Sequence, residues 1–316
     1  MAETRDPAEV MKVSLPERPA RVLVAGDTHG DLDWWEDVLL PAAVDGQADV
    51  IAQLGDFGYW PYAHDRESQA YVGWLSGQLE QRGLMTVFID GNHEDFRALG
   101  KLRPGPDGFV AITDRIYWAP RGHRWVWSGV RFLALGGAYS IDRAYRRLGA
   151  PSFGWFEEEV ISSQQAGTAK AGGSCDVLLT HDAPEGMVPY LFPEGGLMAD
   201  PPAGVNRQAV QAVMEATRPS LLLHGHYHRP AHACLALPSR ADDDGPAEAE
   251  VYSLDCNRAP AHAFGILALP SLVFTSEAGV EHPARDQRTS LERGGARAVA
   301  AQELVPSTQV PLPLRR

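Results

Sequence analysis

Short apolar runs bounded by glycine or aspartate recur along the chain. Five of them lie at residues 21–25, 49–54, 86–89, 176–179 and 220–223. Runs of this length that are rich in β-branched residues or leucine are typical of strands covered on both faces. Two further runs, at residues 130–135 and 251–254, predict additional strands.

Helical patterns lie between these runs. Residues 31–40 predict a helix with an acidic first turn that ends at Pro41, and residues 66–82 predict a longer one. A third helix is expected to begin at Asn206, as its N-cap, and to stop before Pro219. Strands that alternate with helices indicate an α/β domain, and the number of strands favours two sheets over one.

Length and composition bound the domain organisation. The chain has 316 residues, of which 44% are hydrophobic, and this is enough to bury a large core. We expect residues 1–20 to form an N-terminal extension, residues 21–275 the folded domain, and residues 276–316 a mostly disordered tail without sustained periodicity. Residues 163–174 are rich in glycine, alanine, serine and glutamine, and they predict an exposed loop.

Polar side chains that can bind metal ions follow each of the five runs. In chain order they are Asp27 and His29, Asp56, Asn92, His181, and His226 with His228. The carboxyl ends of strands in an α/β sheet form its ligand-binding crevice, so these side chains are expected to meet there. The set predicts a two-metal hydrolytic centre, in which a lone carboxylate such as Asp56 can bridge both ions. Carboxylate, amide and imidazole ligands without a thiolate favour Mn²⁺, Fe or Zn²⁺ over Mg²⁺.

The ordered motifs resemble those of the calcineurin-like metallophosphoesterase superfamily, whose pattern is D-x-H, G-D, G-N-H-[ED], H and G-H-x-H. All five blocks are present, and the resemblance covers roughly residues 21–269. It implies an α/β fold in which a two-sheet β-sandwich is flanked by helices (αββα). It also implies two divalent metal ions, for which we expect Mn²⁺, with Fe or Zn²⁺ as alternatives.

The resemblance further implies how the ligands divide between the two ions. One ion would be held by Asp27, His29, Asp56 and His228. The other would be held by Asp56, Asn92, His181 and His226. A hydroxide that bridges the ions would attack phosphorus, and His93 would stabilise the developing charge or protonate the leaving oxygen.

The chain departs from the protein serine/threonine phosphatases of this superfamily. Those enzymes extend the second block to G-D-x-x-D-R-G and place arginine before the third block. Here Asp56 is followed by Phe-Gly-Tyr-Trp, and Asp90 precedes the third block. The two arginines that hold phosphate in those enzymes are therefore missing, and this disfavours a protein phosphatase.

A replacement for the missing arginines is offered by the glycine-led segment 136–143, which follows a predicted strand. Arg143 is our candidate substrate-binding residue for phosphate, with Arg146 and Arg147 behind it. The alternative interpretation of Arg143 is an ordinary surface arginine in a loop.

Other polar or aromatic residues near the motifs have structural interpretations. Asp31 and Glu94 are interpreted as carboxylates at helix N-termini or as partners that hold the ligands. His224 is expected in the core or beside the ligands. Trp125 and Trp127 have the spacing of one face of a strand, which is more typical of a core than of a base-stacking platform.

The formal net charge of −13 bears on the substrate. An acidic surface repels a nucleic-acid backbone, whose binding depends on lysine and arginine, whereas two bound cations allow a small phosphorylated substrate to bind. We therefore predict hydrolysis of phosphate mono- or diesters of small molecules or nucleotides, with nucleic acid disfavoured. A nuclease and a protein phosphatase are the alternatives. A non-catalytic interaction scaffold ranks last, because neither a ligand nor His93 is missing.

The sequence also predicts where the protein resides. No apolar run approaches the ~18 residues of a membrane span, and the N-terminal segment shows no apolar stretch of a secretory signal. Cys175, Cys234 and Cys256 have no paired spacing, which fits a reducing compartment. We expect a cytoplasmic protein without a membrane partner.

Overall fold

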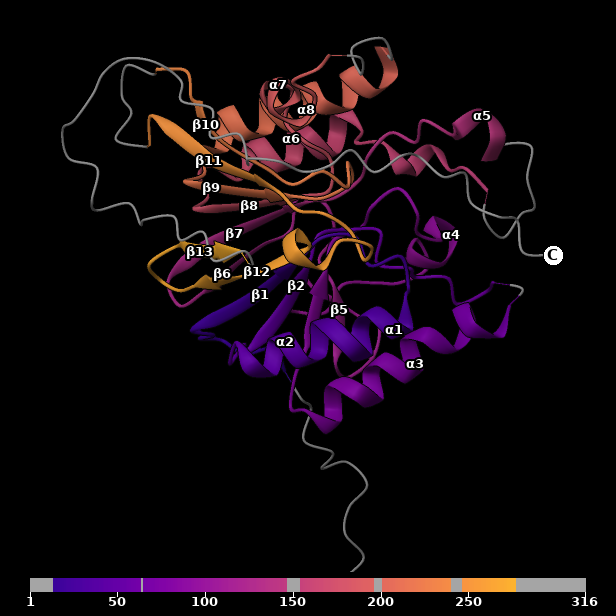
Figure 1. Cartoon of the computed structure of the whole chain (residues 1–316). Coiled ribbons are helices and arrows are strands. Elements are labelled where there is room, and N and C mark those ends of the chain that lie inside the picture. Colours follow the sequence, from indigo (N-terminus) through magenta and orange to yellow (C-terminus); the bar gives the residue numbers. More distant parts are fainter. Residues whose placement is uncertain (1–13, 64, 147–153, 196–200, 240–245, 277–316) are drawn as a thin grey trace, which may run out of the picture.

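Two mixed β-sheets lie face to face, and helices cover their outer sides (Figure 1). This computed structural model describes residues 14–63, 65–146, 154–195, 201–239 and 246–276. The tail predicted from residue 276 onward, apart from Ser276, lies outside the described residues, as does Arg147. The described helices include none with the length and apolar character of a membrane span. The predicted αββα sandwich is confirmed.

The first sheet, within the described residues, has seven strands in the order β13-β12-β1-β2-β3-β5-β4. In that order they are Val273–Ser276, Phe264–Ala268, Arg21–Ala25, Val50–Gln53, Thr86–Phe88, Ile116–Trp118 and Val110–Ala111. Strands β1, β2, β3 and β5 run parallel to one another, and β4, β12 and β13 are antiparallel to their neighbours.

The second sheet, counted over the same described ranges, has six strands in the order β10-β11-β9-β8-β7-β6. In that order they are Ala231–Ala236, Glu248–Ser253, Leu221–His224, Val177–Thr180, Val130–Leu135 and Arg124–Trp127. The central strands β11, β9, β8 and β7 are parallel, and the two edge strands are antiparallel to their neighbours.

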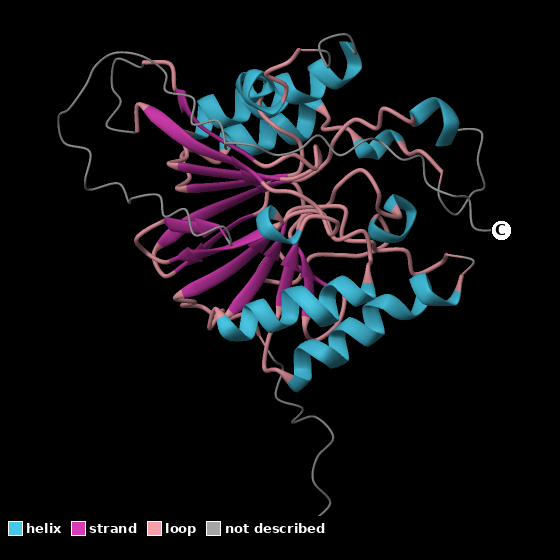
Figure 2. Ribbon diagram, in the orientation of Figure 1, coloured by secondary structure: helices cyan, strands magenta, loops and turns pink. Residues whose placement is uncertain are grey.

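Helices α1–α3 cover the outer face of the first sheet, and α6–α8 cover that of the second (Figures 1 and 2). The helices in the first part of the chain are α1 (Leu32–Trp34), η1 (Trp35–Leu39), α2 (Leu40–Asp45), α3 (Arg66–Gln81) and α4 (Phe96–Leu99). The later ones are α5 (Arg143–Arg146), η2 (Glu157–Glu159), α6 (Ser163–Ala171), η3 (Glu185–Met187), α7 (Val188–Leu191), α8 (Pro201–Thr217) and η4 (Pro260–His262).

The central strands are apolar on both faces because each face packs against a different layer. In β1, Val22 and Val24 lie between the sheets, whereas Leu23 and Ala25 pack against the helices. This explains why the strand segments are continuous apolar runs and do not alternate with polar residues. Trp125 and Trp127 are buried between the sheets, so their interpretation as core residues is confirmed.

The first predicted helix does not end at Pro41. The helix continues as α2 to Asp45, because residues Trp35–Leu39 form a π-helical turn that ends two residues before the proline. The Leu40 N–H bonds to the carbonyl of Trp35, five residues back. A proline inside a regular α-helix lacks one hydrogen bond and clashes with the preceding turn, and the wider π turn relieves this clash.

Asn206 is not an N-cap, since α8 already begins at Pro201. The side chain is buried and joins other parts of the chain instead. Its Oδ1 accepts the Ile161 N–H at 2.8 Å, and its Nδ2 donates to Asp182 Oδ2 at 2.7 Å. In the sequence, an asparagine that caps a helix looks the same as a buried asparagine that bonds to distant parts of the chain. Only the packing of α8 shows which role Asn206 has.

The prediction of a loop at residues 163–174 is wrong for most of that segment, because residues Ser163–Ala171 form α6. Ser162 caps this helix by accepting the Gln165 N–H, and the Gln165 side chain accepts the Ser162 N–H in return. The helix buries Ala166 and Ala169 against the second sheet. Such a reciprocal cap and two small buried residues are sufficient for a short helix once a sheet is there to cover it.

Candidate metal centre

The seven predicted ligands lie on loops that follow five parallel strands. Asp27 and His29 follow β1, Asp56 follows β2, Asn92 follows β3, His181 follows β8, and His226 and His228 follow β9. Figure 2 shows the loops of both sheets gathered at one end of the sandwich. The expected meeting of these loops at the carboxyl ends of the strands is therefore present in three dimensions.

Glycines next to the ligands allow these loops to approach one another closely. A side-chain carbon at Gly91 would collide with the carboxylate of Asp56, and one at Gly225 would collide with the carboxylate of Asp27. The glycine of each motif is thus required by a ligand from another loop. Each motif is short in sequence, but its glycine is needed because of a contact with a distant part of the chain.

Four of the predicted ligands have left-handed backbone conformations. The φ angles are 50° at His29, 52° at Asp56, 70° at His226 and 50° at His228. Such conformations cost about 1–3 kcal/mol each for residues other than glycine, and they persist only where surrounding contacts enforce them. The His29 N–H, for example, donates to the Asp56 carbonyl at 2.7 Å. This clustering of backbone strain marks the loop ends as a functional site.

One half of the centre is formed by Asp27, His29 and His228, whose donor atoms lie within 4.8 Å of one another. His228 Nε2 is 3.0 Å from Asp27 Oδ2, and His29 Nε2 is 3.9 Å from the same oxygen. The His29 imidazole is held from behind, where its Nδ1 lies 3.1 Å from Asn257 Oδ1. That contact leaves Nε2 directed toward the carboxylates, as a metal ligand requires.

The other half is more deeply buried. His181 Nε2 lies 3.1 Å from Asn92 Oδ1, and its Nδ1–H donates to the Leu54 carbonyl at 2.7 Å, which fixes the ring. The Asn92 amide nitrogen donates to Ser140 Oγ at 2.9 Å, so its oxygen faces the centre. The His226 ring lies 5.0 Å from the His181 ring, measured between centroids.

Asp56 lies between the two halves. Its Oδ1 is 3.3 Å from His181 Nε2, and its Oδ2 is 3.6 Å from His29 Nε2. One carboxylate therefore presents one oxygen to each half, which is the arrangement expected of a bridging ligand. Oδ1 also accepts the backbone N–H groups of Asn92 and His93, each at 2.8 Å.

The electrostatics of this cluster favour bound cations. Burial opposes charge on His181, but attraction to Asp56 and Asp27 outweighs burial and raises the pKa of His181 to about 10. Burial likewise opposes charge on His29, and hydrogen bonding and attraction to Asp56 raise its pKa to about 9. The protein thus retains protons where metal ions would supply the positive charge, and metal binding releases such protons. The oxygen and nitrogen donors present fit a pair of divalent ions.

The comparison with protein families agrees with this geometry, because the model of the calcineurin-like phosphoesterases matches residues 20–230. The chain belongs to this family. It is a metal-dependent hydrolase of phosphoric esters, from a family whose members use two divalent ions.

Two solved structures are similar to this phosphoesterase. A dimetal phosphatase from Danio rerio is 16% identical, with 82% of this chain and 96% of that chain covered and a TM-score of 0.45. A conserved uncharacterized protein from Streptococcus pneumoniae TIGR4, a predicted phosphoesterase, is 11% identical, with 89% and 100% covered and a TM-score of 0.33. The comparison with curated proteins gives no match.

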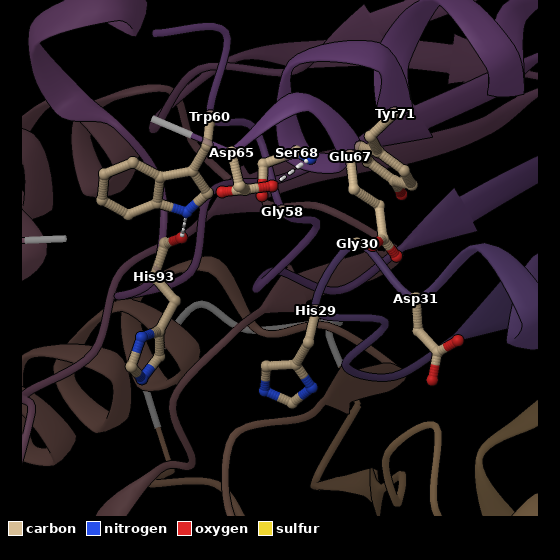
Figure 3. Close-up of a pocket in the computed structure, with 10 residues that line it drawn as sticks. All are labelled: His29, Gly30, Asp31, Gly58, Trp60, Asp65, Glu67, Ser68, Tyr71 and His93. Carbon is tan, nitrogen blue, oxygen red and sulfur yellow. Dashed lines mark hydrogen bonds between the residues drawn. The ribbon is translucent and has the colours of Figure 1, made fainter. Parts of the chain in front are cut away.

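His93 of the phosphoesterase lies beside the ligands without taking part in their mutual contacts. Its ring is 6.2 Å from the His29 ring, and its carbonyl accepts the Trp60 indole N–H at 2.6 Å (Figure 3). Burial lowers the pKa of His93, and the positive charge of Arg146 acts in the same direction against the attraction of Asp56. The imidazole is therefore placed at the rim of the centre, where a substrate can reach it.

The two arginines after the glycine-led segment have different surroundings. Arg143 begins α5, and its guanidinium carbon lies 4.0 Å from the centroid of the Trp155 ring. Arg146 is buried, and its Nη2 donates to Glu159 Oε1 at 2.9 Å and to the Asn92 carbonyl at 3.3 Å. It is thus Arg146 that touches the metal centre. The role of Arg143 in binding phosphate stays a prediction.

Arg146 and Glu159 complete a buried network that sequence reasoning missed. Arg146 Nη1 donates to Ser140 Oγ at 2.7 Å, and the Ser140 hydroxyl donates in turn to Glu159. Ser140 is also the acceptor for the amide of Asn92. Residues 157–159 are three consecutive glutamates, so nothing local indicates that the third one is buried.

Asn257 is another residue that sequence reasoning missed. It bonds His29 through Oδ1, and its Nδ2 donates to Asp31 Oδ2 at 2.6 Å. Asp31 also caps α1 through the Trp34 N–H, so its predicted place at a helix N-terminus is confirmed. Asn257 lies shortly after β11, as the predicted ligands lie shortly after their strands. This position after a predicted strand was the signal in the sequence that could have identified it.

Glu94 ties two ligand loops together. Its Oε1 accepts the Phe57 N–H at 2.6 Å, and its Oε2 accepts the Gly91 N–H at 2.8 Å. One side chain therefore fixes the loop of Asp56 against that of Asn92. Burial, and then repulsion by Asp56, raises the pKa of Glu94 to about 8. The interpretation of Glu94 as a carboxylate that holds the ligand loops is supported by these contacts.

A pocket of ≈ 440 Å³ opens beside the centre (Figure 3). Its lining includes the predicted ligand His29, the neighbouring His93, Trp60 and Tyr71. Three carboxylate residues, Asp31, Asp65 and Glu67, also belong to the lining. The volume falls in the range of pockets that bind small molecules.

Proposed function

We propose that this phosphoesterase hydrolyses phosphate mono- or diesters of small molecules or nucleotides. The observation that supports this most is the junction of the predicted metal centre with the pocket, since the predicted ligand His29 and the neighbouring His93 both line the pocket. A phosphate placed on the metal ions would leave the remainder of the ester in a cavity suited to a small molecule.

The metal ions, for which we propose Mn²⁺, would supply positive charge for the phosphoryl oxygens and lower the pKa of a water to about 7. Asp56 would be shared between them, because its two oxygens face the two halves of the centre. His93 would hold a proton at its ring for the leaving oxygen, and its position at the edge of the pocket supports this role. Arg143 is proposed to contact phosphate from outside the centre.

The charge of the pocket favours small substrates over nucleic acid. Asp31, Asp65 and Glu67 line it, and no lysine or arginine is among the described lining residues. Further phosphates of a nucleic-acid backbone would meet carboxylates there, whereas nucleic-acid binding requires cationic side chains. A neutral or cationic remainder of a small ester meets no such repulsion.

A substrate panel tests the proposal. Metal-stripped full-length protein is reconstituted with Mn²⁺, Zn²⁺ or Mg²⁺ and assayed with p-nitrophenyl phosphate, bis(p-nitrophenyl) phosphate, nucleotides, duplex oligonucleotide and a phosphopeptide. We expect turnover of the small esters, highest with Mn²⁺, and none of the duplex or peptide. Failure with every substrate and metal would instead favour a non-catalytic scaffold. Duplex cleavage that weakens steeply with salt would favour a nuclease.

A matched pair of variants excludes a contaminating phosphatase. Asp56→Asn should remove the activity, whereas Asp33→Asn, which neutralises an exposed carboxylate in α1, should retain it. Activity that survives in purified Asp56→Asn would show that the centre is not responsible for the turnover.

We also propose a cytoplasmic location, which rests on cysteine usage. Among the described residues, Cys175, Cys234 and Cys256 form no disulfide bond with one another. Free thiols are typical of a reducing compartment. Fractionation of the cells that produce the protein, followed by immunoblotting, tests this location.

A further inference from the structure

Three side chains with different donor atoms meet at the edge of the second sheet, and none of them is among the seven predicted ligands. They are His232 and Cys234 on the edge strand β10 and Glu250 on β11 (strands labelled in Figure 1). One donor atom of each, a ring nitrogen, a sulfur and a carboxylate oxygen, lies within 4.8 Å of the other two.

The strand register explains why these residues meet. Cys234 is paired with Glu250, and His232 is paired with Tyr252. Side chains two residues apart on a strand share a face, as do paired residues on neighbouring antiparallel strands. Ala233 and Leu235, which alternate with the donors along β10, pack into the core between this sheet and its helices. The three donors therefore project from the opposite face of the sheet.

The surroundings hold the imidazole in place. The Tyr252 ring stacks on the His232 ring with centroids 4.3 Å apart and planes inclined by 19°. Tyr252 is itself buried and packs against Phe274 of β13 at 5.0 Å. His232 Nε2 lies 2.5 Å from Glu250 Oε2, which is a hydrogen bond. The side chains of His232 and Glu250 are 22% and 23% exposed, so an ion can reach them from solvent.

We propose that His232, Cys234 and Glu250 bind one zinc ion at this sheet edge, separately from the binuclear centre. Imidazole, thiolate and carboxylate are the ligands that zinc takes in proteins, and a thiolate selects against Mn²⁺ and Mg²⁺. A tetrahedral zinc ion holds such donors at about 2.0–2.3 Å, which places them roughly 3.3–3.8 Å apart. Small rotations of the side chains bring the three donors to that spacing.

Zinc binding would replace protons at this site. The Cys234 thiol would lose its proton to solvent, and the ion would take the place of the proton that His232 and Glu250 share. Three protein ligands leave a fourth position for water. Because the ligands come from two strands, the ion would cross-link β10 to β11 at the edge of the sheet.

Cobalt spectroscopy on the metal-stripped full-length chain tests the proposal. A thiolate bound to Co²⁺ gives a charge-transfer band in the near ultraviolet, and none of the seven ligands predicted for the binuclear centre carries sulfur. We expect the band in the wild type, its loss in Cys234→Ser, and its retention in Cys175→Ser. Absence of the band in the wild type, or its retention in Cys234→Ser, would overturn the proposal.

Cys256 needs its own control, because its thiol interacts with the predicted ligand His228. Cys256→Ser should keep the band. A band lost in Cys256→Ser and kept in Cys234→Ser would assign the thiolate to the binuclear centre and would contradict the edge site.

Zinc content provides the second measurement, and it does not depend on activity. His232→Ala should hold about one equivalent of zinc fewer than the wild type, while Mn²⁺-dependent turnover stays unchanged. With the binuclear centre already loaded with Mn²⁺, added zinc should raise the melting temperature of the wild type by more than that of His232→Ala. Equal zinc content in folded wild type and folded His232→Ala would refute the site, whatever substrate the enzyme takes.

Discussion

The two halves of the metal centre differ in exposure and in the groups that hold them. The half formed by Asp27, His29 and His228 faces solvent, with 31% of the His29 side chain and 41% of the His228 side chain exposed. In the half around Asn92 and His181, the His181 side chain is fully buried. Both halves share Asp56.

The supporting contacts follow the same division. The buried half is held by the Leu54 carbonyl and by the network of Ser140, Glu159 and Arg146. The exposed half is held by the neutral side chain of Asn257 at His29 and by the thiol of Cys256 at His228. A buried ion pair loses hydration and is retained where it fixes a geometry. We infer that one half is arranged before a metal ion binds, and that the other is open to exchange and to substrate.

The largest effect is expected at Asp56, because it belongs to both halves. Asp56→Asn removes charge from both proposed sites, so the occupancy of both ions should fall. Bound ions supply several kcal/mol to the transition state, and each ~1.4 kcal/mol is tenfold in rate, so kcat/KM should fall at least ~10³-fold. Metal analysis checks this. Two tightly held ions in purified Asp56→Asn would disprove the shared ligand.

His93 sharpens the comparison, since it lies at the rim and completes neither half. His93→Asn should keep both ions and lose turnover by ~10²–10⁴-fold, the usual contribution of a general acid. The loss should shrink for nitrophenyl esters, whose leaving group needs little protonation. Kinetics with esters of poor and good leaving groups measure this. A wild-type rate on a poor leaving group would refute the acid role.

Arg146→Met tests the support of the buried half. It leaves the buried Glu159 without its cationic partner, which should cost about 3–5 kcal/mol of unfolding free energy. Urea denaturation of the metal-free protein gives the difference. The matched control is Arg143→Met, three residues earlier, for which the described residues offer no buried ion pair. If both variants lost equal stability, the Arg146 network would not be what distinguishes this half.

Asn257→Ala tests the support of the exposed half. The Nδ1 of His29 would lose its partner, and losses of this kind typically weaken metal binding by ~10–100-fold. Calorimetric titration of the metal-free protein should show one weakened binding step. Ser140→Ala, on the buried side, should weaken the other step. If both variants weakened the same step, the two halves would not be independent.

The smallest effect is expected at Arg143, which contacts neither half in the described hydrogen bonds. Arg143→Ala should reduce kcat/KM by up to ~5-fold, as expected for one exposed charged contact of about 1 kcal/mol. Metal content should stay normal, and it is measured on the same preparation. Unchanged kcat/KM on the best substrate would return Arg143 to an ordinary surface residue.

Much of the fold and the site was determined by local patterns in the sequence. The apolar runs predicted the five strands that carry the ligands, because a buried strand must be apolar on both faces wherever it lies in a sheet. The predicted ligands were visible because a motif such as Asn92-His93 lies within a few residues of the end of its strand, and the end of a strand is a local feature. The glycines beside Asp56 and Asn92 belong to the same short motifs.

Only the tertiary structure decided what pairs across the chain. Asn206 is a residue type that commonly caps helices, but in the structure its buried side chain bonds to Ile161 and Asp182. It does so because α8 packs over the segments that hold these two residues. Glu159 and Asn257 could not be assigned, since their partners lie far away in sequence. Polar side chains take their roles from whatever partners burial brings within hydrogen-bonding distance, and the order of residues along the chain does not encode that distance.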